Sequence, residues 1–156
     1  MDLPNALLTL PFPLRGSGIN HEDQHFSGTL QLQILPGANM ILGYAAHGEN
    51  SELYHQESTL LGCLPDGALC LWPAMDELPF ILAHPVTRQR RPSTDLLIAE
   101  FASGPLDDTH RFRQQISIEL DLNGRLRYAH AWGLPDGEFA DRSYCDFTFT
   151  PTTGHR

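Results

Sequence analysis

The segment RFRQQISIELDLNGRLRYAHAWG, residues 111–133, decides the fold class, because two alternating runs flank the turn formers Asn123 and Gly124. A loop of three residues pairs Leu120 with Leu126 and brings opposite charges together on the other face. A loop of two residues would place leucine beside arginine. Since a slip of one residue turns every side chain to the other face, the sequence predicts the three-residue register. The segment is therefore predicted to be an antiparallel hairpin with Gly124 at positive φ.

Extended away from the turn, this register changes the character of the hairpin's apolar face. Near the turn the face is purely apolar, and farther out it carries an amide, a phenol, an imidazole and an indole, from Gln114, Tyr128, His130 and Trp132. Buried polar groups need partners, and a face that becomes polar at one end is typical of a lined cavity. We therefore predict that these four residues bind a ligand; mutual hydrogen bonding is the structural alternative.

Alternation with a period of two continues along most of the chain from Phe26 onward, and no segment shows a sustained helical period. Short runs of this kind, separated by turn residues, are typical of an all-β sandwich or barrel. The sequence predicts one all-β domain over residues 1–156, an antiparallel up-and-down β-barrel of about nine or ten strands. Residues 1–25 are expected to form an N-terminal segment and the first strand, with at most a short helix near residues 5–10. Residues 150–156 are expected to be a flexible tail.

The charge of the chain excludes one large class of function. Its net charge is −9 and its ten basic residues are all arginine, so it lacks the basic surface that nucleic-acid binding requires. The run Arg88, Arg90, Arg91 is interpreted as a solvated loop. No signal peptide or membrane-spanning stretch is recognised, so we expect a cytoplasmic protein without a membrane partner. The three cysteines are expected to be reduced, packed thiols.

The stretch HEDQH, residues 21–25, matches the zinc motif H-E-x-x-H, which works on a helix because its two histidines then share one face. Glycines flank the stretch and strand alternation begins at Phe26, so the sequence predicts neither a helix nor a metal site here. His55 and Glu57 share a strand face and are interpreted as a structural pair. No other catalytic motif is recognised, and we expect a binding protein rather than an enzyme.

The strand pattern resembles the calycin-like small β-barrels, which include lipocalins, fatty-acid-binding proteins and nitrobindin-like haem proteins. PLRGSG, followed by a strand and by YHQES, is similar to the nitrobindin-like layout, with His55 and Glu57 at matching positions. That resemblance implies haem as a cofactor, with His130 as its axial ligand. Arg142 and Tyr144 resemble the Arg-x-Tyr pair by which intracellular fatty-acid-binding proteins hold a carboxylate. Strand alternation points both away from the apolar face unless a bulge intervenes.

The function predicted from these features is binding of a small, largely hydrophobic ligand inside a β-barrel of the lipocalin or fatty-acid-binding type. The four polar hairpin residues would orient the ligand, and Arg142 and Tyr144 would hold an anionic group. Two alternatives stay open. One is a haem-binding protein similar to nitrobindin, and the other is a non-catalytic barrel with a packed interior that forms a homodimer through its apolar strands.

Overall fold

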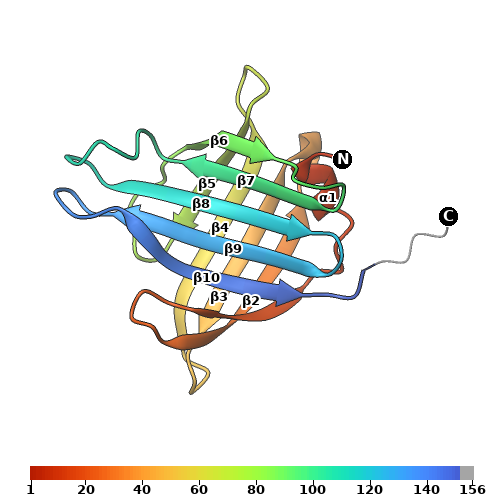
Figure 1. Ribbon diagram of the computed structural model, residues 1–156, viewed down its shortest axis with the longest axis horizontal. Coiled ribbons are helices and arrows are strands. Elements are labelled where there is room, and N and C mark those ends of the chain that lie inside the picture. The colour runs from red at the N-terminus through yellow and green to blue at the C-terminus, as the bar shows by residue number, and fades with distance from the viewer. Residues whose placement is uncertain (152–156) are drawn as a thin grey trace.

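The computed structural model describes residues 1–151, which form one closed antiparallel barrel of ten strands. Each strand pairs with its neighbours in the chain, and β1 pairs with β10 to close the ring (Figure 1). The predicted all-β up-and-down barrel is confirmed. Most of the predicted tail lies outside the described residues. The elements are α1 (Leu3–Leu7), β1 (Leu14–Ile19), β2 (His25–Ile34), the 3₁₀ turn η1 (Pro36–Ala38), β3 (Met40–His47), β4 (Leu53–Cys63), β5 (Leu69–Met75), β6 (His84–Arg90), β7 (Leu96–Ala102), β8 (Arg113–Asp121), β9 (Arg125–Gly133) and β10 (Ala140–Thr148).

The hairpin of β8 and β9 has the three-residue register that the sequence predicts. Leu120 lies opposite Leu126, and Ile116 lies opposite His130. Gly124 has a φ of 126°, a value that side-chain-bearing residues rarely adopt. The predicted inner face is therefore the inner face of the barrel, and its apolar half next to the turn is fully buried.

Two glycines allow β1 to close the ring against β10. A Cβ atom at Gly18 would lie 1.9 Å from the carbonyl oxygen of Tyr144, and one at Gly16 would lie 2.1 Å from that of Asp146. Any other residue would clash with the backbone of β10 at these positions. Across β9 and β10, Arg127 donates two hydrogen bonds of 2.7 Å to the carboxylate of Asp146 on the outer surface.

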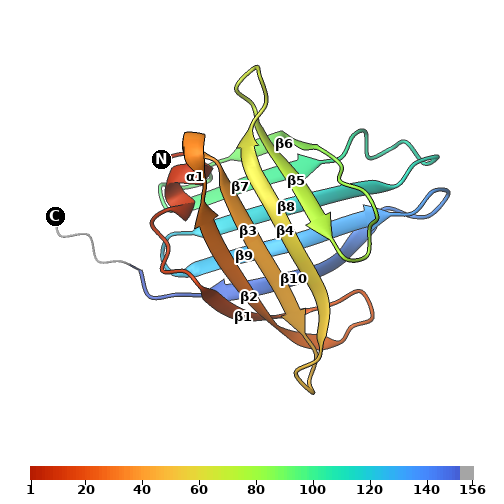
Figure 2. The same cartoon turned by 180° about the vertical axis from the view of Figure 1, so that it is seen from behind.

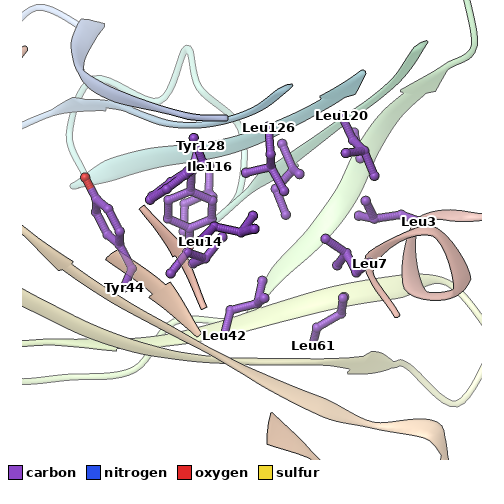
Figure 3. Packing of buried hydrophobic residues seen from close by; sticks show 14 of the residues in the cluster. Leu3, Leu7, Leu14, Leu42, Tyr44, Leu61, Ile116, Leu120, Leu126 and Tyr128 are labelled. Carbon is purple, nitrogen blue, oxygen red and sulfur yellow. The ribbon is translucent and has the colours of Figure 1, made fainter. Parts of the chain in front are cut away.

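The short helix α1 closes one end of the barrel. The side chain of Asp2 caps its first turn. Leu3 and Leu7 are completely buried, and they point toward Leu61 and Leu120 inside the barrel (Figure 3). The loops β7–β8 and β9–β10 lie on the side of the barrel away from α1 (Figure 2). The packed core is therefore concentrated at the α1 end.

The arginine-rich segment is a strand, which corrects the prediction of a loop there. β6 (His84–Arg90) includes Arg88, which lies opposite Glu100 of β7, and Arg90 lies 3.6 Å from the same carboxylate. The apolar segment before it is a loop up to residue 83. A β-ladder is made by main-chain groups, so a polar segment forms one wherever a partner strand is available.

All three cysteines are free thiols; Cys70 and Cys145 are buried as expected, whereas Cys63, at the end of β4, is exposed. Within residues 1–151 no helix has the length and apolar character needed to cross a membrane.

Candidate functional site

A cavity of about 880 Å³ occupies the end of the barrel opposite α1. Its volume lies within the roughly 300–1,000 Å³ typical of small-molecule sites. Residues from the β1–β2, β3–β4, β5–β6 and β9–β10 connections form its mouth. Its apolar and aromatic wall consists of Phe26, Tyr44, Tyr54, Met75, Leu78, Phe112, Trp132 and Leu134.

The mouth of the cavity is acidic. No arginine or lysine lines it within residues 1–151, and its acidic lining residues are Glu22, Asp23, Glu49, Glu52 and Glu77. Charges of one sign around a concave opening focus the electric field and select ligands by charge. The mouth of the cavity therefore favours a neutral or cationic ligand over an anionic one.

A buried carboxylate lies behind the floor of the cavity, which His55 and His130 line. Glu57 of β4 is only 1% exposed. Its Oε2 lies 2.8 Å from Nε2 of His130 on β9 and 3.2 Å from Nε2 of His55. β4 and β9 are five strands apart in the ring of ten, so this contact spans the lumen between opposite walls. The bridge separates the packed half of the barrel from the open half.

The second oxygen of this carboxylate is also fully engaged. Tyr128 and Thr59 both donate their hydroxyl groups to Oε1 of Glu57, the latter over 2.7 Å. Burial by itself raises the pKa of Glu57, but the charge and hydrogen bond of His130, and hydrogen bonds from His55 and Thr59, bring the pKa below its usual range. The carboxylate is therefore ionised at neutral pH.

His55 is held between two carboxylates. Its Nδ1 lies 2.6 Å from Oε1 of Glu77, while its Nε2 faces Glu57. Burial lowers the pKa of His55, but the hydrogen bonds to Glu57 and Glu77 outweigh it and raise the pKa to about 10. The ring of Tyr44 packs beside this cluster, stacked 5.9 Å from the ring of His130 at 24°.

Three of the four polar hairpin residues predicted to bind a ligand line the cavity: Gln114, His130 and Trp132. Tyr128 is completely buried behind them, where its hydroxyl bonds to Glu57.

Arg142 and Tyr144 do not line the cavity, so the predicted grip on a carboxylate does not form there. A bulge between Asp141 and Ser143 turns Ser143 inward. Arg142 instead lies 4.4 Å from the centre of the Trp132 ring and donates to the carbonyl oxygen of Trp132. Tyr144 packs under Arg127 on the outer surface. Arg142 therefore holds the cavity's tryptophan in place.

Glu57 and His55 were not predicted to be site residues. Both lie on the same inward-facing side of β4 as Thr59 and Leu61, and a carboxylate at an inward-facing position is the signal that marks them. Their partner His130 is distant in the chain, so the cluster itself is visible only in three dimensions.

The H-E-x-x-H stretch is a turn between β1 and β2. Asp23 has a φ of 58°, which no α-helix contains. His21 and His25 line the mouth of the cavity, and the ring of His21 packs edge-on to Trp132 at 5.7 Å. The helical geometry of a zinc protease is not formed.

Comparison with known proteins relates this chain to others through its fold. No protein-family model matches it, and no curated protein does. Among solved structures, it is similar to Rv2717c from M. tuberculosis, with a TM-score of 0.74 and 13% sequence identity over 92% of this chain and 94% of that one. At this identity the likeness establishes a shared barrel fold.

Proposed function

We propose that this barrel binds a small, largely apolar molecule, neutral or cationic, in the cavity opposite α1. The observation that carries the proposal is an aromatic wall above a polar floor. Trp132 and Phe112 on the wall offer large apolar contact areas. His55 and His130 on the floor can orient a polar group of the ligand. Membership in the calycin-like superfamily, supported by the closed ten-stranded barrel, is part of this proposal.

The acidic mouth separates this proposal from fatty-acid binding. A carboxylate entering the cavity would first pass the carboxylates of the mouth. Arg142, the guanidinium expected to receive it, stacks on Trp132 and donates to backbone carbonyls instead. A neutral aromatic or hydroxylated molecule, or an organic cation, meets neither obstacle.

The residues present do not fit haem. Nε2 of His130 lies 2.8 Å from the carboxylate of Glu57, and iron coordination through that atom would break this bond. The haem propionates would also meet the acidic mouth. The third alternative, a barrel with a packed interior, is disfavoured by the cavity volume of about 880 Å³.

A matched pair of fluorescent probes tests this function. N-phenyl-1-naphthylamine and 1-anilinonaphthalene-8-sulfonate share one ring system, and only the second carries an anionic group. We expect the neutral probe to bind at least about tenfold more tightly, corresponding to about 1.4 kcal/mol. The electrostatic part of this preference should shrink between about 0.02 and 0.5 M salt, as the Debye length falls from roughly 20 to 4 Å. Fluorescence titration measures both dissociation constants.

The two tryptophans of the chain supply a matched pair of variants. Trp132 lines the cavity, whereas Trp72 of β5 does not. We expect W132A to weaken binding of the neutral probe at least about tenfold, because the ring's apolar contact is lost. W72A should leave the affinity unchanged. Equal effects of the two substitutions, or tighter binding of the sulfonate, would contradict the proposed cavity function.

A further inference from the structure

We propose that His55, Glu57 and His130 form a binding site for a divalent first-row transition metal ion such as Zn²⁺ at the floor of the cavity. The two imidazole Nε2 atoms, from opposite walls of the barrel, converge on the same carboxylate oxygen, Oε2 of Glu57. The three donor atoms all lie within 4.8 Å of one another. Two imidazoles and one carboxylate are a common donor set for Zn²⁺ and for non-haem Fe²⁺.

The outer partners of His55 and Glu57 match those of a metal centre. Metal-binding histidines usually bond through the second ring nitrogen to a carboxylate, which fixes the ring orientation. Glu77 provides this contact to His55, with its Oε1 2.6 Å from Nδ1. Ligating carboxylates are likewise hydrogen-bonded in turn. The hydroxyls of Tyr128 and Thr59 both bind Oε1 of Glu57, so Oε2 is the oxygen directed at the histidines.

The distances between the donors are close to what an ion needs. Bonds of about 2.0–2.2 Å in a tetrahedral arrangement separate neighbouring ligand atoms by roughly 3.3–3.5 Å. The separation of His55 Nε2 from Glu57 Oε2 is 3.2 Å. That of His130 Nε2 from the same oxygen is 2.8 Å, and it would have to widen by about 0.5 Å to reach this range.

The position of the cluster gives an ion a route and an open coordination position. His55 and His130 both line the cavity, whose acidic mouth attracts cations. Three protein ligands leave a fourth position of a tetrahedral ion for solvent or for a polar group of the cavity's ligand. This inference stands apart from the proposed function, because an apolar molecule can occupy the cavity with or without the ion.

Direct metal titration tests the site. Protein treated with a chelator is titrated with Zn²⁺ in competition with a chromophoric chelator, and Co²⁺ absorption reports the coordination. We expect one ion per chain in the wild type. H55Q and H130Q should each weaken Zn²⁺ binding at least about 100-fold and remove the Co²⁺ bands. E77Q, which changes an outer partner, should weaken it by about 10- to 100-fold.

The histidines of the mouth provide the control. The double variant H21A/H25A removes two imidazoles that line the cavity away from the floor and should keep the wild-type affinity. Circular dichroism checks that each variant is folded. E77Q carries the test if the buried substitutions unfold the chain, because the side chain of Glu77 is 53% exposed. Absence of Zn²⁺ binding in the wild type, unchanged binding in E77Q and H55Q, or loss of binding in H21A/H25A overturns the proposal.

The two proposals fail separately. Binding of N-phenyl-1-naphthylamine is measured on the chelator-treated protein, so its loss refutes the cavity function without bearing on the metal. Absence of Zn²⁺ binding in a protein that still binds the probe refutes the metal site alone.

Discussion

Polar residues can be buried inside this barrel because their polar groups are hydrogen-bonded to partners. Glu57 is a buried charge, which is costly unless it is hydrogen-bonded. Each of its two oxygens faces two donors: Tyr128 and Thr59 at one, His55 and His130 at the other. An inward-facing carboxylate is therefore compatible with a stable barrel only because residues of two opposite walls surround it.

His84 shows the same dependence on its neighbours, at the start of β6. It is completely buried, with Nδ1 2.7 Å from the carbonyl oxygen of Leu82 and Nε2 3.1 Å from Oε1 of Gln114. Burial lowers the pKa of His84, and the contact with Leu82 offsets this only partly. Since the folded pKa lies below the unfolded value of about 6.5, the unfolded chain takes up the proton first as the pH falls.

This ordering predicts the sign of a pH effect. The contribution of His84 to stability is present above about pH 6.5 and is lost as the pH falls toward the lower folded pKa, by at most about 1.4 kcal/mol per pH unit. We expect H84N to be less stable than the wild type at pH 8, with the difference shrinking toward pH 5. Urea unfolding at several pH values measures it. A difference that stays constant with pH would contradict this prediction, because it would mean that the pKa of His84 is the same in the folded and the unfolded protein.

Among the elements, the structure of the β8–β9 hairpin follows from its local sequence pattern, whereas that of β6 does not. The hairpin's register follows from its own side chains, since only one pairing places leucine against leucine and acid against arginine. β6 has no such internal pattern. It is a strand because β7 offers its edge, with Arg88 opposite Glu100.

Arg113 at the start of β8 joins the loops at the open end. It is only 4% exposed. Its guanidinium donates to the carbonyl oxygens of Leu134 and Gly137 at 2.9 and 2.6 Å, and to that of Leu106 at 3.4 Å. The β7–β8 and β9–β10 loops are thus bound to one strand.

Substitution of this arginine should loosen both loops. We expect R113M to lower the free energy of unfolding by about 2–3 kcal/mol, because several charge-assisted hydrogen bonds are lost. Arg111 is the control, since its side chain is 83% exposed, and R111M should change stability by less than about 0.5 kcal/mol. Denaturant unfolding compares the two. An equal loss in both variants would mean that the bonds of Arg113 contribute nothing specific.

The two ends of the barrel differ in structure: one is packed and the other is hollow. α1 and the apolar half of the core fill one end, while the cavity and its polar floor occupy the other. In Figure 3, Leu3 and Leu7 of α1 lie at one side of the apolar cluster, and Tyr44, which lines the cavity, lies at the other.

This division predicts that stability and binding can be changed independently. We expect L7A to lower the free energy of unfolding by about 2–5 kcal/mol through the cavity it leaves in the core. Its affinity for N-phenyl-1-naphthylamine should stay within about twofold of the wild type, because Leu7 lies at the far end. L8A is the matched control, since Leu8 is 46% exposed, and it should cost less than about 1 kcal/mol. A large loss of probe affinity in folded L7A would show that the two ends are coupled.

The sequence alone determined the barrel, the register of the β8–β9 hairpin and the inward direction of Gln114, His130 and Trp132, because alternation and turn chemistry act between residues close in the chain. Only the tertiary structure decided the bridge between Glu57 and His130, the contact of Arg142 with Trp132 and the strand character of β6. These depend on which walls face each other across the lumen, where a bulge falls, and which strand supplies a free edge. Such choices follow from closure of the whole ring, which no local pattern encodes.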